Sequence, residues 1–218
     1  MYKGDIIVVL TPTMYKCKHR HTGLEHPNCY VAFLEKSKDL NVGYLDIETS
    51  NLDADFGVIF SYAIKPKGLD ECDYSVITKS EIFKSDYDKW VVKDLIDDLK
   101  QYDVIYTYYG KRFDIPYIRS RALYHKLKFP MYRELYHIDL YDQAKHKLKL
   151  SSNRLANVTK FLGIKGKNSV QSRYWLKAMT GDKLSLDYIL DHNIRDVEIL
   201  EKFHERIKPY FARANSSI

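Results

Sequence analysis

The sequence has few cysteines, glycines and prolines, and it lacks long apolar runs. Its 218 residues include 3 cysteines, 9 glycines and 6 prolines. Three cysteines are too few for a disulfide scaffold. No apolar stretch approaches the roughly 20 residues that a membrane-spanning helix needs, and the N-terminus shows no signal-peptide pattern. We therefore expect a soluble, intracellular protein that has no membrane partner.

Positive charge and tyrosine are in excess. The formal net charge is +6, and 19 residues are tyrosine. A positive net charge favours an anionic partner, and aromatic rings offer faces on which the bases of a single nucleic-acid strand stack. The alternative interpretation is that the tyrosines are mostly core and strand residues. The chain is long enough for one sizeable α/β domain with a small appendage.

The apolar pattern predicts alternating strands and helices. Runs bounded by turn residues predict strands at 5–10, 42–48, 58–64, 74–78 and 104–109. Helical spacing predicts helices at 86–102, where Trp90, Leu95 and Leu99 set the spacing, and at 114–127, 152–162, 170–179 and 185–208. The segment 137–146 fits a strand and a helix equally. This order predicts an α/β fold, a mixed β-sheet flanked by α-helices.

Two acids interrupt the apolar run "VGYLDIET" at 42–49. Asp46 and Glu48 are two positions apart in a predicted strand, so their side chains share one face. Neighbouring carboxylates repel each other and lose solvation on burial, and a divalent cation between them would relieve both effects. On spacing alone, an exposed strand face with two solvated acids explains the pattern equally well.

Two further acids occur at helices. Asp114 opens the helix predicted at 114–127, where the N-terminal dipole favours a carboxylate, and taken alone it is explained by capping. On a wheel of the last helix, Asp196 falls inside the apolar stripe near Phe203, and His192 lies beside it one turn earlier. A solvated face does not explain an acid on the buried side. A buried ion pair is the alternative.

Three motifs carry a resemblance to a known family. "YLDIET", "TYYGKRFDIPYI" and "DHNIRDVEIL", in this order, resemble the exonuclease motifs of the DEDD (DnaQ-like) 3′–5′ exonucleases, which include the proofreading domains of DNA polymerases. The resemblance spans residues 41–208 and implies a ribonuclease H-like fold. It also implies four metal ligands, which are Asp46, Glu48, Asp114 and Asp196. In the family these acids bind two Mg²⁺ or Mn²⁺ ions, which suit hard oxygen ligands.

The chain departs from this family at two positions. The family has either a tyrosine separated from the last aspartate by three residues or a histidine separated by four. His192 combines the tyrosine spacing with the histidine side chain, and we expect it to orient or deprotonate the attacking water. Tyr109 stands where many relatives have asparagine. We expect Tyr109, Phe113 and Lys111 to contact the substrate, with stacking by the aromatic rings.

A Cys/His-rich segment lies near the N-terminus. "CKHRHTGLEHPNC" contains five candidate zinc ligands, which are Cys17, His19, His21, His26 and Cys29. In an intracellular protein such a cluster binds zinc more often than it forms disulfides. Four ligands complete a tetrahedral site. Cys17, His26 and Cys29 are expected members, and His19 and His21 compete for the fourth place. A basic, histidine-rich loop with two incidental thiols is the alternative.

These observations predict a two-part chain. Residues 1–40 would form a strand and a zinc-binding knuckle, and residues 41–218 a ribonuclease H-like exonuclease domain. The expected activity is metal-dependent 3′–5′ hydrolysis of single-stranded DNA to nucleoside monophosphates by two metal ions. One alternative is an RNA 3′–5′ exonuclease of the same fold. The other is a catalytically silent module that binds nucleic acid.

Overall fold

The computed structural model describes residues 15–26, 29–30, 33, 40–131, 134–166 and 171–210. These residues fall into two compact units. The larger unit is Asn41–Phe211, and the smaller unit contains the Cys/His segment. The strand predicted at 5–10 lies outside the described residues. The division into domains at 1–40 and 41–218 stays a prediction.

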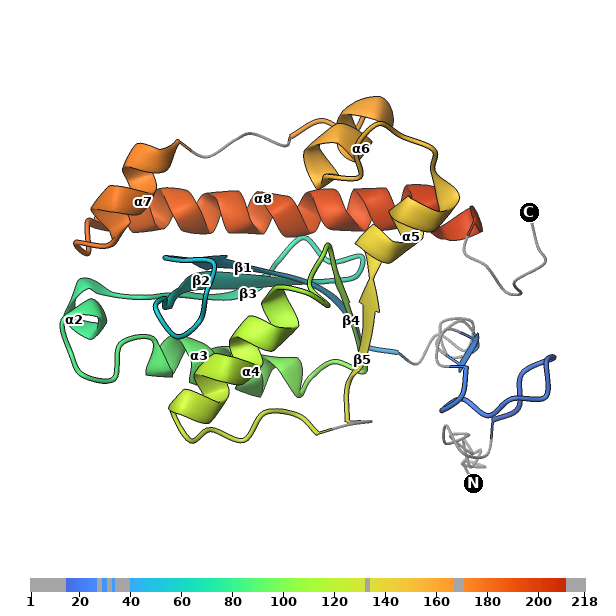
Figure 1. Ribbon diagram of the computed structural model, residues 1–218, viewed down its shortest axis with the longest axis horizontal. Helices are drawn as coiled ribbons and strands as arrows, with labels where there is room; N and C mark the ends of the chain where they lie inside the picture. Colours follow the sequence, from blue (N-terminus) through green and yellow to red (C-terminus); the bar gives the residue numbers. More distant parts are fainter. Residues whose placement is uncertain are drawn as a thin grey trace, which may run out of the picture. The chain divides into compact units, whose positions relative to one another are not determined.

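A five-stranded mixed sheet organises the larger unit (Figure 1). Its strands are β1 (Val42–Thr49), β2 (Ile59–Pro66), β3 (Asp73–Val76), β4 (Val104–Thr107) and β5 (Tyr136–Asp139). Their spatial order is β3-β2-β1-β4-β5. β2 pairs antiparallel with β1 and β3, whereas β4 pairs parallel with β1 and β5. The carboxyl ends of β1, β4 and β5 therefore point to the same edge of the sheet.

Helices cover both faces of this sheet. The helices of this unit are α2 (Lys79–Ile82), α3 (Lys89–Leu99), α4 (Asp114–Tyr124), α5 (Leu140–Lys147), α6 (Leu155–Phe161), α7 (Ser172–Ala178) and α8 (Lys183–Ile207), followed by the 3-10 helix η1 (Lys208–Tyr210). The long helix α8 runs along one face, and α3 and α4 lie on the other (Figure 1). This is the mixed sheet flanked by helices that the sequence predicts.

Strand β1 separates an apolar face from an acidic one. Leu45 and Ile47 are buried in the hydrophobic core, which also contains apolar residues of α3 and α4. Asp46 and Glu48 point the other way and make hydrogen bonds to side chains of α8. Because side chains alternate along a strand, a single strand supplies both the core and the acids. The acids thus lie between the sheet and α8.

A buried aromatic cluster joins α8 to the sheet near the end of the helix. The hydroxyl oxygen of Tyr44 lies 2.7 Å from Nδ1 of His204, and the rings of Tyr106 and His204 are 4.1 Å apart between centroids. All three side chains are buried. Burial, together with the charges of Lys208 and Lys67, lowers the pKa of His204 to about 3. The imidazole is therefore neutral at pH 7.

The structure resolves one ambiguous segment, adds the short helix α2, which was not predicted, and corrects one expectation. The ambiguous segment 137–146 divides into a strand and a helix, because β5 ends at Asp139 and α5 begins at the next residue. Trp90 was expected on the apolar side of its helix, but half of its surface (50%) is exposed, and this expectation was wrong. Val91 and Val92 face the core instead. Within the described ranges, no helix combines the length and apolar character needed to cross a bilayer.

Candidate active site

Three side chains from β1 and α8 come together at the end of β1. Ligand atoms of Glu48, His192 and Asp196 all lie within 4.8 Å of one another. Nδ1 of His192 is 3.2 Å from Oε1 of Glu48 and 3.8 Å from Oδ2 of Asp196. Asp196 is only 6% exposed, which places it on the buried side of α8 as its position on the wheel indicates. The imidazole thus lies against both carboxylates.

Asp46 lies on the same face of β1 and is held by a residue that sequence reasoning missed. Nδ2 of Asn193 donates to Oδ2 of Asp46 at 2.7 Å, and Oγ of Ser61 donates to Oδ1 of Asn193 at 3.2 Å. Asn193 is fully buried. Asn193 could have been found from its position in α8, because it is three residues before Asp196 and therefore lies on the same side of the helix.

Asp114 reaches the site from the first turn of α4. Its Oδ1 accepts a hydrogen bond from the backbone N–H of Ile47 at 3.2 Å, and its side chain is buried. Burial, with added repulsion from Asp139 and Glu48, raises the pKa of Asp114 to about 7. A cation at the site would favour the charged form. Hard carboxylate oxygens in this environment suit Mg²⁺ or Mn²⁺, so the side chains present fit a divalent ion.

Asp139 organises the turn that precedes Asp114. Its carboxylate accepts hydrogen bonds from the backbone N–H groups of Tyr109 at 2.8 Å and Lys111 at 3.0 Å. It also caps α5 by accepting from the N–H of Tyr141 at 2.9 Å. Sequence reasoning missed Asp139 because it ends the segment whose structure was ambiguous. An acid between a short apolar run and a helix is a capping signal, and that signal was available.

The three expected substrate-binding residues differ in their exposure. Tyr109 is 45% exposed, and the side chain of Lys111 is largely exposed, with Nζ 3.8 Å from Oδ2 of Asp142. Phe113 is partly buried and packs against the hydrophobic core. Tyr109 and Lys111 are therefore the more accessible of the three.

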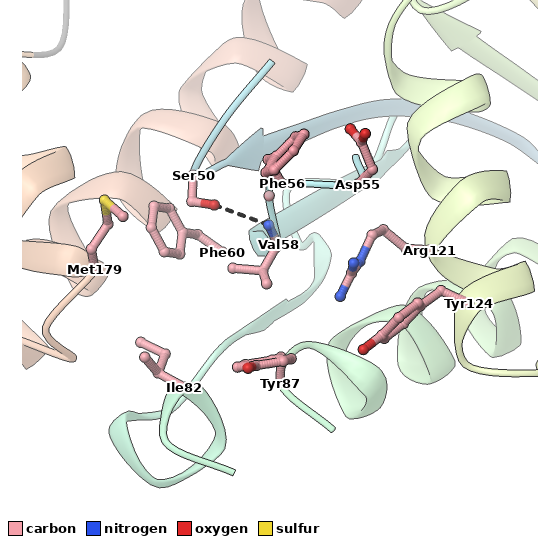
Figure 2. Close-up of a pocket in the computed structure, with 11 residues that line it drawn as sticks. Ser50, Asp55, Phe56, Val58, Phe60, Ile82, Tyr87, Arg121, Tyr124 and Met179 are labelled. Atoms are coloured by element: carbon pink, nitrogen blue, oxygen red, sulfur yellow. Dashed lines mark hydrogen bonds between the residues drawn. The ribbon is translucent and has the colours of Figure 1, made fainter. Parts of the chain in front are cut away.

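A pocket of about 360 Å³ opens beside the loop that follows β1 (Figure 2). Its lining includes Phe56, Tyr87 and Tyr124, and none of the four candidate metal ligands. The guanidinium of Arg121 also lines it, but Nε of Arg121 donates to Oδ2 of the buried Asp88 at 3.0 Å. The positive charge at the pocket is thus already balanced by a carboxylate. Asp46, Glu48 and Asp196 lie between β1 and α8, apart from this pocket.

The smaller unit brings four of the five Cys/His residues together. Cys17, His19, His26 and Cys29 offer ligand atoms within 4.8 Å of one another. Sγ of Cys17 lies 3.6 Å from Nδ1 of His19 and 3.7 Å from Nδ1 of His26. Sγ of Cys29 lies 3.8 Å from each of the same two nitrogens. His21 is exposed and is not a member of this group, although its ring lies 4.3 Å from that of His26.

These four distances fit one tetrahedral ion. With bonds of about 2.3 Å to sulfur and about 2.0–2.1 Å to nitrogen, the sulfur–nitrogen edge of a zinc tetrahedron is about 3.6 Å long. Each of the four observed sulfur–nitrogen distances is within a few tenths of an ångström of that value. The structure thus groups His19, rather than His21, with the three ligands that the sequence favoured.

Comparisons with known proteins place the larger unit in a family. A family model described as RNase_H superfamily matches residues 43–208, which is more than half of the chain. A DNA polymerase of Methanocaldococcus jannaschii is 31% identical over 133 residues, covering 50% of this chain and 8% of that protein. The family B DNA polymerase from the hyperthermophilic archaeon Pyrobaculum calidifontis has a similar fold, with a TM-score of 0.64 and 18% identity over 78% of this chain and 25% of that chain.

The chain therefore spans only a small part of the polymerases that it resembles. The family match confirms the ribonuclease H-like fold that the three motifs implied. It supports hydrolysis of nucleic acid as the activity of the larger unit. The chain belongs to the ribonuclease H superfamily.

Proposed function

We propose that the protein is a metal-dependent 3′–5′ exonuclease that hydrolyses single-stranded DNA to nucleoside monophosphates. The observation that carries this proposal is the approach of Glu48 and Asp196, whose ligand atoms lie within 4.8 Å of each other and of His192, while Asp46 lies on the same face of β1 and Asp114 accepts from the N–H of Ile47 between them. We propose that all four carboxylates, contributed by β1, α4 and α8, form one site. They are Asp46, Glu48, Asp114 and Asp196. The similarity to two DNA polymerases favours DNA as the substrate.

The four carboxylates would hold two Mg²⁺ or Mn²⁺ ions. Bound ions of this kind lower the pKa of a water molecule and neutralise charge on the leaving oxygen. The protein's own groups fix the carboxylates in advance. The N–H of Ile47 orients Asp114, and the amide of Asn193 orients Asp46. Such supporting hydrogen bonds fix the orientation of metal ligands.

His192 would position the attacking water. When Nδ1 carries its proton and donates to Glu48, the other ring nitrogen is the basic one. We propose that this nitrogen orients the water or accepts its proton. The tyrosine spacing relative to Asp196 brings the imidazole within 3.8 Å of that carboxylate.

We also propose that the Cys/His group of the smaller unit binds one structural zinc ion. Its ligands would be Cys17, His19, His26 and Cys29. Two thiolates and two imidazoles suit zinc, whereas Mg²⁺ and Mn²⁺ prefer oxygen ligands. The near-equal sulfur–nitrogen distances support a single ion bound by all four side chains.

A nuclease assay on DNA and RNA side by side tests the proposed activity. Single strands labelled at the 5′ end are incubated with the protein and Mg²⁺ or Mn²⁺. We expect the DNA strand to shorten from its 3′ end in single-nucleotide steps, with mononucleotides released and no cleavage when EDTA is present. Faster shortening of RNA would establish an RNA exonuclease instead. Binding of both strands without cleavage would establish a catalytically silent module.

Two variants of α8 provide the matched control. Asp196→Asn removes a buried carboxylate of the proposed site, whereas Asp191→Asn removes an exposed one that pairs with Arg195 at 2.6 Å. We expect the first variant to lose hydrolysis and the second to retain it. Equal activity of both variants, each with a thermal transition like the parent's, would refute the assignment of the site.

A further inference from the structure

We propose that Tyr109, Tyr141 and Arg112 form a platform on which one base of the substrate strand stacks, and that Asp139 holds this platform in place. The inference deepens the proposed function, because it takes a single nucleic-acid strand as the ligand. Asp139 and Tyr141 belong to the segment 137–146, for which the sequence predicted no role. We call the three side chains the Tyr109 platform.

The backbone of Tyr109 is strained. Its φ angle is +70°, in the left-handed region that residues other than glycine seldom adopt. Such a conformation costs on the order of 1–3 kcal/mol and persists only where the surroundings enforce it. Here the enforcing group is Asp139, which accepts the N–H groups of Tyr109 and Lys111. In this conformation Tyr109 is 45% exposed.

The exposed ring has an ordered environment. The rings of Tyr109 and Tyr141 meet edge to face, with centroids 5.0 Å apart and planes at 83°. Cζ of Arg112 lies 5.5 Å from the centroid of Tyr109 and 5.6 Å from that of Tyr141. Nη1 of Arg112 also donates to Oδ1 of Asp142 at 3.0 Å. The two rings and the guanidinium are therefore positioned before any ligand arrives, which lowers the ordering cost of binding.

Asp139 couples the two parts of the platform. The same carboxylate that holds the turn at Tyr109 accepts from the N–H of Tyr141 at the start of α5. One buried side chain thus fixes the backbone beneath both rings. The N–H groups of both tyrosines donate to Oδ1 and that of Lys111 donates to Oδ2, so alanine, which removes both acceptors, is the change that releases the platform.

The platform adjoins the proposed reaction site. Hydrogen bonds within the turn connect it to α4, since the N–H of Phe113 donates to the carbonyl of Tyr109 at 3.1 Å and that of Ile115 to the carbonyl of Gly110 at 2.9 Å. Asp114 begins α4 within this turn, and Asp139 contributes to its raised pKa. A strand whose end lies at the carboxylates therefore has a nucleotide within reach of Tyr109.

The chemistry of the platform favours a nucleobase. Bases stack on aromatic rings and on guanidinium planes whatever their sequence, whereas Lys111 beside the rings offers a positive charge to a phosphate. The side chain of Lys111 is 68% exposed. A cationic and aromatic surface of this kind suits a single strand with its bases exposed.

Strand binding is measured without the ions that hydrolysis needs, so the platform is tested independently of catalysis. Fluorescence anisotropy without added Mg²⁺ or Mn²⁺ and without chelator measures the affinity for labelled single strands that carry one abasic position, moved stepwise from the 3′ end. We expect one abasic position to weaken binding of the parent protein by about 5- to 150-fold, the fold-change that corresponds to losing one stacked base. Tyr109→Gly should bind the intact strand about as weakly and lose its sensitivity to that abasic position.

The glycine variant also has a signature that a structural role would not give. Glycine adopts a positive φ without strain, so Tyr109→Gly should unfold at a higher temperature than the parent while binding more weakly. Tyr109→Phe should keep the affinity. Tyr74→Ala is the control, because Tyr74 is exposed on β3, at the edge of the sheet opposite β5.

Asp139→Ala tests the positioning role. It should weaken binding of the intact strand, and combining it with Tyr109→Gly should add nothing further, because both changes remove the same interaction. Additive losses would overturn the role of Asp139. Unchanged affinity and an unchanged abasic profile in Tyr109→Gly would overturn the platform, even if the parent hydrolyses DNA. Platform-dependent binding without hydrolysis in Mg²⁺ or Mn²⁺ would leave the platform standing and refute the exonuclease.

Discussion

The side-chain amide of Asn193 donates a hydrogen bond to Asp46 across the interface between α8 and β1, with 2.7 Å between Nδ2 and Oδ2. The hydroxyl of Ser61 donates to the other end of the amide at 3.2 Å, which fixes its orientation. A neutral donor thus holds one carboxylate of an acidic cluster without adding a charge. The long helix therefore supplies both a candidate ligand, Asp196, and the group that orients a second one.

Asn193→Ala should lower the rate of hydrolysis by more than its loss of folding stability would explain. Loss of a hydrogen bond that orients a metal ligand reduces metal affinity or activity by about 10- to 100-fold. We expect the rate of DNA hydrolysis to fall by that factor and the Mn²⁺ concentration for half-maximal activity to rise. Asn157→Ala is the control, because that amide donates to the carbonyl of Ser152. Parental metal dependence in a folded Asn193→Ala protein would contradict the role of this amide.

Asp114→Asn should stabilise the metal-free protein at alkaline pH. Burial and the nearby charges of Asp139 and Glu48 raise the pKa of Asp114 to about 7 in the folded state, against an unperturbed value of 3.8. Between these values the folded state holds a proton that the unfolded state releases, so the free energy of unfolding falls as pH rises from 3.8 to about 7 and then levels off.

The thermal transition without added Mg²⁺ or Mn²⁺ and without chelator measures this effect. The asparagine variant should unfold at a higher temperature than the parent at pH 8, by about 2–4 °C for each kcal/mol relieved, and the difference should vanish near pH 4. Adding Mn²⁺ at pH 8 should raise the transition of the parent more than that of the variant. A constant difference across this pH range would contradict the raised pKa.

His204 should destabilise the protein as pH falls. Burial, with the charges of Lys208 and Lys67, lowers the pKa of His204 to about 3 in the folded state, against an unperturbed 6.5. Between these values only the unfolded state binds the proton, so the free energy of unfolding decreases as pH falls below 6.5. His204→Gln should unfold more readily at pH 7, because the buried contact with Tyr44 changes, but with a weaker pH dependence from 7 to 4. Parallel pH curves for the two proteins would rule out this contribution.

Zinc should copurify with the protein at about one equivalent. Cys17→Ser and His19→Ala should each reduce the zinc content and lower the thermal transition, because metal-binding free energy is also folding free energy. His21→Ala is the matched control and should retain both, since His21 lies outside the group of four. Elemental analysis of protein never exposed to chelator measures the zinc. Equal zinc loss in His19→Ala and His21→Ala would contradict the ligand assignment.

The acids of the candidate site could be found from the sequence because the periodicity of a strand or helix determines the face on which each side chain lies. Alternation in β1 puts Asp46 and Glu48 on one face, and the wheel of α8 puts Asp196 on the buried side. Asn193 shares that buried side, but periodicity gives only its direction. Its hydrogen-bond partner in β1 depends on how α8 packs across the sheet, and a pattern along one helix does not contain that packing.

Two other features depend on a short strand and a tight turn, and neither leaves a repeating pattern of residues in the sequence. β5 has four residues, too few for alternation to establish a strand, so its final residue Asp139 was not recognised as an acceptor for a distant turn. The choice between His19 and His21 depends on a tight turn in which Arg20 has a φ of +66°. Residue spacing left both histidines available, and the backbone of the turn separates them.

His192→Ala should lower the rate of DNA hydrolysis by roughly 10²–10⁴, the usual effect of losing a general acid–base group. His192→Tyr should recover part of this rate, because the separation from Asp196 already matches the tyrosine type of the family. The parent should lose activity on the acid side as the imidazole becomes protonated, and the tyrosine variant should lack that limb of the pH profile.

Two other roles of His192 give different results in the same measurements. If the imidazole were a metal ligand, as its place within 4.8 Å of Glu48 and Asp196 permits, His192→Ala would raise the Mn²⁺ concentration for half-maximal activity, and saturating Mn²⁺ would restore much of the rate. If it only packed beside Glu48, the alanine variant would lose stability but keep its rate and pH profile. A water-positioning role requires a rate that stays low at saturating Mn²⁺, because the four carboxylates still hold the ions. Steady-state rates of the three proteins, measured against Mn²⁺ concentration at several pH values, therefore separate all three roles.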